Sequence, residues 1–221
     1  KNWTKSYAAA IAPFAKLAQE TGMTKFCIGT EMETLKFDAD VWNTVIASVR
    51  EDYKGPLGFN LNWWGSKNTF DDILSKTGWM SGLDFIGISG YFEISSSAGA
   101  TKKQMETGWT AIRPDGESIK NQVTKLKQNF GKPLYFWEIG YRSLDGNAMH
   151  PWNWGIDAPA DETEQADAFQ AFLSVFGDGK NTNGFAVWTS DPGMKKTNKG
   201  YDIFDKPSEI VFKNFFDKNQ N

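Results

Sequence analysis

Two glutamates, Glu31 and Glu138, each stand at the end of a short apolar segment of the sequence. The segments, residues 25–31 and 133–138, are predicted to be buried strands. Two carboxyl groups that face each other suit glycosidic cleavage, because one protonates the leaving oxygen while the other attacks the sugar or activates water. At a separation of roughly 5–5.5 Å the second carboxylate acts as the nucleophile and the sugar keeps its configuration. The pair therefore predicts this chemistry, provided that the fold brings the two carboxyls together.

Three further side chains end other predicted strands and suit the same site. Asn62 is expected to bind a sugar hydroxyl, Tyr91 to donate a hydrogen bond to whichever glutamate is the nucleophile, and Trp188 to form a floor under the reacting sugar. Ten tryptophans are present, and some of them occur in polar, loop-like sequence where rings that stack on sugars are found. These candidate platforms are Trp63, Trp64, Trp152 and Trp154.

Each of these residues also has a simpler interpretation. A single glutamate is as easily an ion-paired or helix-capping residue, and Tyr91 has packing as its alternative role. Glu33 is the alternative candidate to Glu31, because residues two apart in a strand share a face. Its position, however, predicts that it lies in the loop beyond the strand. His150 is as well explained by a structural role as by substrate contact.

The elements that must position these residues alternate between strands and helices. Such alternation predicts a parallel sheet with helices outside it. An open, doubly wound sheet is less favoured, since the strands lack continuous Val/Ile character and no glycine-rich phosphate loop follows the first strand. Strands are predicted at 25–31, 56–62, 84–91, 133–138 and 184–188. Helices are predicted at 7–20 (with Pro13 producing a kink or a late start), 39–52, 70–76, 117–130, 163–176 and 207–217.

Residues two apart in a strand share a face, so alternation predicts which side chains meet. On one face of each strand, the last residue at the carboxyl end is polar or aromatic. In a (β/α) barrel the catalytic groups lie at the carboxyl ends of the strands. Phe85, Ile86 and Ile88 are expected on the opposite face, against the helices. The rows of the first face are Cys27, Gly29, Glu31; Gly58, Asn60, Asn62; Gly87, Ser89, Tyr91; Leu134, Phe136, Glu138; and Ala186, Trp188.

Several motifs resemble glycoside hydrolase family 113, a clan A family known for β-1,4-mannanases. They are Ile28-Gly-Thr-Glu31, Gly90-Tyr-Phe92, Glu138-Ile-Gly-Tyr-Arg-Ser143, Pro151-Trp152 and Tyr201-Asp-Ile-Phe-Asp-Lys-Pro207. The resemblance implies a retaining, endo-acting hydrolase with Glu31 as acid/base and Glu138 as nucleophile, and it matches Tyr91 and Trp188 to subsite residues. Relatives commonly have Thr before the nucleophile, where this chain has Trp137; alternation predicts that Trp137 faces away from the barrel axis.

The resemblance also implies an eight-stranded (β/α)8 TIM barrel of which this chain carries about five βα units, strands four to eight. Residues 1–221 are accordingly expected to form a single, partial barrel domain. Five strands leave open edges, so the missing N-terminal barrel portion or another chain is an expected partner. Two alternatives stay open: a carbohydrate-binding barrel fragment without catalysis, and a retaining β-glucanase or xylanase.

Composition narrows the remaining function classes. The net charge of −3 shows no excess of basic residues of the kind that would bind nucleic acid. One cysteine, Cys27, and one histidine leave no cysteine-based metal cluster, so neither a metal nor a cofactor is expected. No apolar run is long enough to span a membrane. The expected partner is a polysaccharide or oligosaccharide, and the sequon Asn2-Trp3-Thr4 slightly favours secretion.

Overall fold

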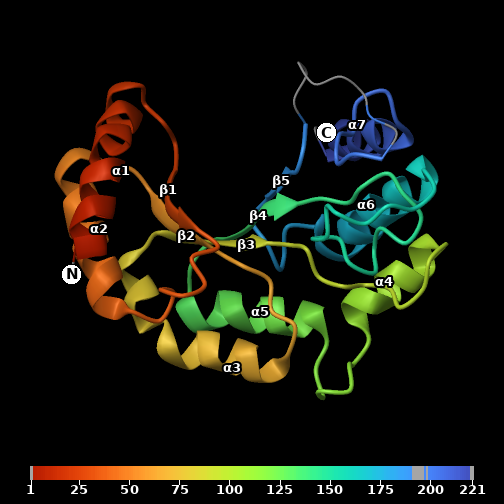
Figure 1. Ribbon diagram of the computed structural model, residues 1–221, viewed down its shortest axis with the longest axis horizontal. Coiled ribbons are helices and arrows are strands. Elements are labelled where there is room, and N and C mark those ends of the chain that lie inside the picture. Colours follow the sequence, from red (N-terminus) through yellow and green to blue (C-terminus); the bar gives the residue numbers. More distant parts are fainter. Residues whose placement is uncertain (1, 191–196, 198, 220–221) are drawn as a thin grey trace. The chain divides into compact units, whose positions relative to one another are not determined.

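Five parallel strands and the helices around them form an α/β architecture, a partial TIM barrel (Figure 1). The computed structural model describes residues 2–190, 197 and 199–219. Strands β1 (Phe26–Thr30), β2 (Leu57–Leu61), β3 (Phe85–Ser89), β4 (Leu134–Ile139) and β5 (Phe185–Val187) are hydrogen-bonded in chain order. Every predicted strand is therefore confirmed, with ends that differ by a few residues. None of the helices in the described ranges has the length and apolar character that a membrane span requires.

The chain divides into two compact units. The first consists of Lys1–Ser89 with Lys125–Tyr135, and the second of Gly90–Thr124 with Phe136–Asn221. Helix α5 (Ile119–Phe130) and strand β4 contribute residues to both. Each unit has an aromatic core of its own, and each carries one of the two glutamates.

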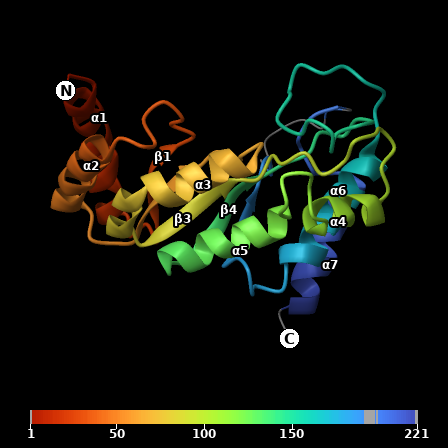
Figure 2. The same ribbon diagram turned by 90° about the horizontal axis from the view of Figure 1, so that it is seen from below.

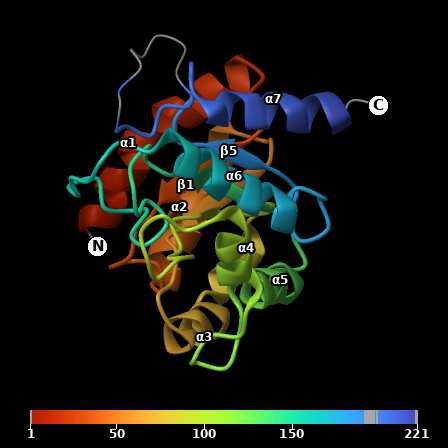
Figure 3. The same cartoon turned by 90° about the vertical axis from the view of Figure 1, so that its right-hand side faces the viewer.

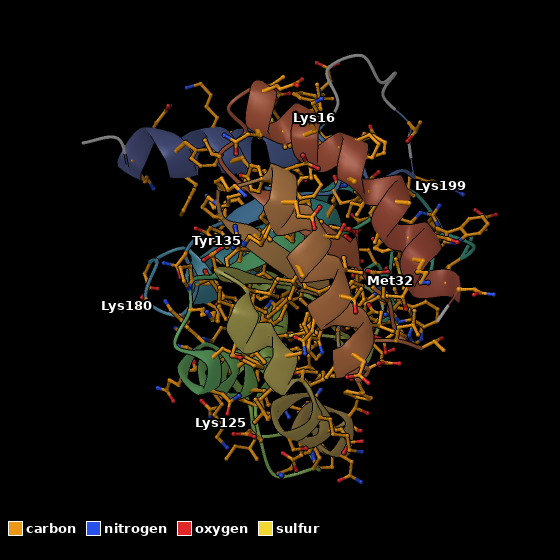
Figure 4. All side chains as sticks on the ribbon, turned by 90° about the vertical axis from the view of Figure 1, so that its left-hand side faces the viewer. Lys16, Met32, Lys125, Tyr135, Lys180 and Lys199 are labelled. Atoms are coloured by element: carbon orange, nitrogen blue, oxygen red, sulfur yellow. The ribbon has the colours of Figure 1, made fainter. Side chains whose placement is uncertain are left out.

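In the first unit, helices α1 (Asn2–Glu20) and α2 (Ala39–Asp52) lie side by side (Figure 4). Helix α1 begins at Asn2 and continues through Pro13, so the late start predicted from that proline is wrong. Helix α3 (Lys67–Lys76) lies on one side of β2 and β3 (Figures 1 and 2), and the short 3-10 helix η1 (Gly78–Gly82) follows it. The core rings Trp42, Phe59 and Trp79 have centroids 4.6–5.2 Å apart.

In the second unit, helix α6 (Glu162–Phe176) packs against both α4 (Lys102–Thr110) and α7 (Pro207–Asn219) (Figure 3). The sequence did not predict α4, which has little apolar periodicity. Its start is nonetheless marked by a capping box, in which Thr101 and Gln104 satisfy each other's backbone N–H groups.

Strands β2 and β3 confirm the predicted phase with one exception. The Asn60 amide donates to Ser89 Oγ at 2.8 Å, so Asn60 and Ser89 share the predicted face. Phe85 was expected on the opposite face, and this is wrong: a Cβ added to Gly58 would lie 2.1 Å from the Phe85 ring. Gly58 is paired with Phe85 across the two strands, and the absent side chain makes room for the buried ring.

The predicted phase of β4 is also wrong. Phe136 was expected on the same face as Glu138, but its ring packs against Trp109, Phe172 and Phe176 on the helical side. Its neighbour Tyr135 faces the other way and meets Phe85 edge to face at 5.7 Å. The prediction that Trp137 faces away from the barrel axis depended on the wrong phase and has lost its basis.

Each of the two strands that lead to a glutamate, β1 and β4, has one residue more than its partner strand over the same stretch of pairing, close to the glutamate. In β1 the pairing passes from Cys27↔Gly58 to Thr30↔Asn60, three residues against two. In β4 it passes from Phe136↔Phe185 to Ile139↔Val187, again three against two. An inserted residue of this kind, a β-bulge, re-aims the side chains that follow and interrupts simple alternation. Alternation alone therefore could not have predicted the direction of either glutamate.

Candidate active site

Glu31 leaves β1 in a backbone conformation that is rare for its residue type. Its amide N–H still donates to Asn60 O at 2.9 Å, so it is tied to the end of β2. Its φ of 54° then turns the chain sharply, and Met32 beyond it is labelled in Figure 4. A left-handed conformation costs a residue with a Cβ of order 1–3 kcal/mol and concentrates at functional sites. The bulge and this turn together set the position of Glu31 at the strand end.

Glu33, the rival of Glu31, has a structural explanation. It is exposed in the turn after β1 and pairs with the ammonium group of Lys36, which is itself buried. A buried ammonium needs a nearby carboxylate, because removing a charge from water without a partner is costly. The structure thus supports the loop position expected for Glu33.

The end of β2 carries the other predicted residues of the first unit. Asn62 Oδ1 accepts the backbone N–H of Trp63 at 3.0 Å, which leaves its amide NH2 to reach a ligand. Trp63 is half-buried, but Trp64 is only 1 % exposed and packs against Phe70. The expectation that Trp64 is a platform is therefore wrong, since the ring belongs to the core.

Asn60 was not singled out from the sequence as a site residue. Its side chain is fully buried, and its Oδ1 has no hydrogen-bond partner while its amide holds Ser89. A buried polar atom without a partner calls for a local explanation. The available signal was a lone asparagine in the apolar run of β2, on the face that ends in Asn62.

In the second unit Glu138 is held from both its side chain and its backbone. Tyr91 Oη donates to Glu138 Oε2 at 2.9 Å, which confirms the hydrogen bond predicted between them. The N–H of Gly90 donates to Glu138 O at 2.7 Å, and the Trp188 N–H donates to Ile139 O at 2.8 Å. Tyr91 is 7 % exposed, so its hydroxyl works in a largely dry environment where such a bond is strong.

Trp188 follows β5 and stays 51 % exposed, as a ring that receives a flat ligand must be. The peptide bond from Trp188 to Thr189 is cis. A Cβ added to Gly140 would lie 2.4 Å from Trp188 O and 3.2 Å from the Tyr201 ring. Gly140, two residues after Glu138, therefore allows the backbone of Trp188 to approach closely.

Residues 145–160 form a loop with the remaining predicted side chains. His150 Nδ1 and Trp152 Nε1 both contact Glu93 Oε1, at 3.0 and 3.4 Å, and all three side chains are exposed. Trp152 is 41 % exposed and Trp154 81 %. Glu93, which orients both the histidine and the indole, was not predicted as a site residue.

Two residues that were not predicted as site residues anchor this loop. Arg142 Nη1 donates to Trp154 O at 2.9 Å and to Ile156 O at 2.6 Å. Tyr201 Oη donates to Pro151 O, and the Tyr201 ring meets that of Tyr91 edge-on at 6.3 Å. Both residues lie in the family-like motifs, which was the signal available in the sequence.

A buried ion pair supports the segment that carries Tyr201. Lys206 Nζ lies 2.9 Å from Asp202 Oδ2 and donates to Ser143 Oγ at 2.9 Å. The Asp202 carboxylate also accepts from Thr197. Burial raises the pKa of Asp202, but the hydrogen bonds from Thr197 and Lys206 outweigh it and hold that pKa below its ordinary value. Asp202 is thus ionised and paired in the folded protein.

The predicted residues therefore fall into two groups. Glu31, Asn62 and Trp63 belong to the first unit, and Tyr91, Glu138, Trp152 and Trp188 to the second. Within the second group, Tyr91 and Glu138 are in direct contact. The expected separation of the Glu31 and Glu138 carboxyls stays a prediction.

Comparison with known proteins gives a consistent relationship. The model for Glycoside Hydrolase Family 113 matches residues 1–206. Two solved structures of family 113 β-1,4-mannanases, one of them of a complex, are 26 % and 25 % identical; each has a TM-score of 0.76, over 97 % of this chain and 62 % of theirs. This chain thus spans about three fifths of the length of these relatives. The comparison with curated proteins found no match.

Two further solved structures, at lower identity, have a similar fold. The β-mannanase AaManA from Alicyclobacillus acidocaldarius, in complex with ManMIm, is 24 % identical with a TM-score of 0.75, over 98 % of this chain and 62 % of its own. A β-glucuronidase from Ruminococcus gnavus is 12 % identical with a TM-score of 0.61, over 96 % and 36 % of the two chains.

Replacing Lys206 by Met tests the buried ion pair. The variant leaves the Asp202 carboxylate buried without its cation, and breaking such a pair costs ~3–5 kcal/mol. We expect a large drop in the urea midpoint of unfolding, followed by tryptophan fluorescence.

The matched control is Lys213→Met, which removes an exposed pair of the same spacing with Asp217. We expect no measurable change there, because solvent screens exposed pairs. Equal midpoints for the two variants would contradict the structural role given to Lys206.

Proposed function

This chain belongs to glycoside hydrolase family 113, and from that premise we propose that it is a retaining, endo-acting hydrolase of β-1,4-mannan. Glu138 is the nucleophile and Glu31 the acid/base. The observation that carries the proposal is the 2.9 Å hydrogen bond from Tyr91 to Glu138, made where the carboxyl end of β4 adjoins the end of β5. In barrels of this kind the carboxyl ends of the strands form the active-site face.

The Tyr91 hydroxyl suits Glu138 to nucleophilic attack. Donation to a carboxylate oxygen stabilises the ionised form of Glu138 and fixes the orientation of the carboxylate for attack on the anomeric carbon. The backbone bond from Gly90 holds the main chain of Glu138 at the same time. A nucleophile held at two points loses little freedom when the substrate binds.

The reaction follows in two displacements. Glu138 attacks the anomeric carbon while Glu31 gives its proton to the departing glycosidic oxygen, and a covalent glycosyl–enzyme forms. Glu31, now ionised, removes a proton from water, which attacks the same carbon and releases the sugar and the Glu138 carboxylate. The sugar regains its starting configuration. The tied backbone of Glu31, with its unusual turn, is the local feature that supports a functional rather than a capping role.

Exposed aromatic and amide groups supply the substrate contacts in this proposal. Trp188 and Trp152 offer half-exposed rings for stacking on pyranose faces, and Trp63 and Asn62 contribute from the end of β2. The preference for mannan over glucan or xylan depends on the 2-hydroxyl, and it is supported here by the family 113 mannanases with 25–26 % identity.

The glutamate roles are tested by separate Glu31→Gln and Glu138→Gln variants of the full-length protein, assayed on mannan and glucomannan. Loss of acid–base catalysis typically lowers kcat by ~10²–10⁴-fold, and we expect at least that loss in each variant. Glu51→Gln is the control, because it changes an exposed carboxylate of α2 that has no role in the proposed site.

Near-wild-type turnover in either glutamine variant would contradict the catalytic role assigned to that glutamate. Oligosaccharide binding without hydrolysis, unchanged by Glu138→Gln, would favour a carbohydrate-binding protein instead. If the protein hydrolyses β-glucan or xylan but not mannan, the catalytic roles of the glutamates would stand and the assignment of mannan as the substrate would be wrong.

Replacing Tyr91 by Phe tests the role of its hydroxyl. A hydrogen bond to a charged group contributes ~1.5–3 kcal/mol, so we expect kcat/KM to fall ~10–100-fold. The loss should appear mainly in kcat, since Tyr91 acts through Glu138.

Tyr53→Phe is the control, because it removes another buried tyrosine hydroxyl that donates to Met23 O at 2.8 Å. It should leave the kinetics unchanged. A Tyr91→Phe variant with full activity would show that the hydroxyl only packs.

A further inference from the structure

Three carboxylates gather at the base of the 145–160 loop, apart from the proposed catalytic pair. One oxygen from each of Asp145, Asp161 and Glu164 lies within 4.8 Å of the others. Asp145 lies at the start of the loop, whereas Asp161 caps helix α6 and Glu164 lies in its first turn. An antiparallel bridge between Leu144 and Ala160 closes the loop beside them.

Backbone N–H groups hold each of these carboxylates by one oxygen. Gly99 donates to Asp145 Oδ1, the Glu164 N–H donates to Asp161 Oδ1, and Gly146 donates to Glu164 Oε2, each at 2.8 Å. The remaining Glu164 oxygen, Oε1, is buried and has no hydrogen-bond partner, in a residue that is 3 % exposed. A buried carboxylate oxygen beside two other carboxylates requires a proton or a cation.

Nothing basic neutralises the cluster within the described part of the chain. No lysine, arginine or histidine side chain in that part of the chain forms an ion pair with Asp145, Asp161 or Glu164. The dipole of α6 supplies only about half a positive charge at its N-terminus, against three formal negative charges.

We propose that Asp145, Asp161 and Glu164 bind a calcium ion that fastens the two ends of this loop. All three ligands are hard oxygens, and their spacing of up to 4.8 Å suits an ion that accepts irregular oxygen shells. Magnesium is a poorer match because it demands a tight octahedron and retains its waters. Asn147, two residues after Asp145, has a buried amide whose oxygen and nitrogen both lack a hydrogen-bond partner.

The ion would act on a functional part of the molecule. It would join the start of the loop to the first turn of α6, and the loop between them carries Trp152 and Trp154. Preorganising such a loop removes part of the entropy cost of ligand binding. Calcium is thus a structural ligand here and takes no part in bond cleavage.

The test is titration of EDTA-treated protein with calcium chloride by isothermal calorimetry, together with thermal unfolding. We expect one saturable site, a rise in Tm with calcium, and a smaller response to magnesium. Asp161→Asn keeps the α6 cap, because an asparagine oxygen also accepts the Glu164 N–H, and it removes one ligand charge. This variant and Glu164→Gln should bind calcium at least tenfold more weakly, whereas Glu51→Gln, at an exposed position of α2, should bind as the parent does.

A second measurement reports on the loop itself. Calcium should slow proteolysis within residues 145–160 in the parent protein and have no such effect in Asp161→Asn. No binding up to about 10 mM calcium, beyond the ~10⁻³ M of the weakest biological sites, would overturn the proposal, as would equal binding by the variants. None of these readouts involves cleavage of a glycosidic bond, so the calcium proposal stands or falls separately from the proposed activity.

Discussion

One extra residue in each of two strands determines how this chain presents its glutamates. A strict strand alternates its side chains between two faces, so a single inserted residue reverses every position that follows. In β1 the insertion falls between Cys27 and Thr30, immediately before Glu31, and in β4 it falls between Phe136 and Ile139, around Glu138. Each strand can therefore bury its apolar residues in one phase and present its glutamate in another.

The surrounding structure keeps these irregularities in place. Gly58 and Gly140 leave room for the Phe85 ring and for the backbone of Trp188, where any side chain would collide. Hydrogen bonds from the Glu31 N–H to Asn60 O and from the Trp188 N–H to Ile139 O continue the strand pairing beyond the two interruptions. The loop that follows β4 is held by Arg142, and the segment around Tyr201 by the buried Lys206 ion pair. Function in this account depends on backbone geometry as much as on the carboxyl groups.

Much of the fold followed from sequence patterns, and the failures have identifiable causes. The bounds of α2 were predicted correctly from its apolar periodicity, and the strand positions followed from short apolar runs. Bulges leave no such pattern, so the face assigned to Phe136 was wrong although the strand itself was right. The pairing of β2 with β3 is regular, and Phe85 was assigned to the wrong face because apolar residues occupy both faces of β3. Trp64 looked like a surface platform because its neighbours are polar, but tertiary packing against Phe70 buries it.

The site was more predictable in its residues than in its contacts. Tyr91 was predicted at a strand end as a donor to the nucleophile, and the family resemblance identified that residue as Glu138; the hydrogen bond between the two is present. Glu93, Tyr201 and the carboxylates near α6 act through contacts across loops, which no local pattern encodes. Long-range contacts of this kind are where a sequence read alone gives least information.

Covalent capture of the nucleophile tests the central claim most directly. A mannosyl or mannobiosyl fluoride with fluorine at C2 forms its glycosyl–enzyme faster than water can release it, because the fluorine destabilises both oxocarbenium-like transition states while the good leaving group speeds the first. After incubation with the full-length protein and peptide mass spectrometry, the account predicts one label per chain, on the peptide containing Glu138 and at that carboxylate. A label on another carboxylate, or none from a protein that hydrolyses mannan, would contradict it.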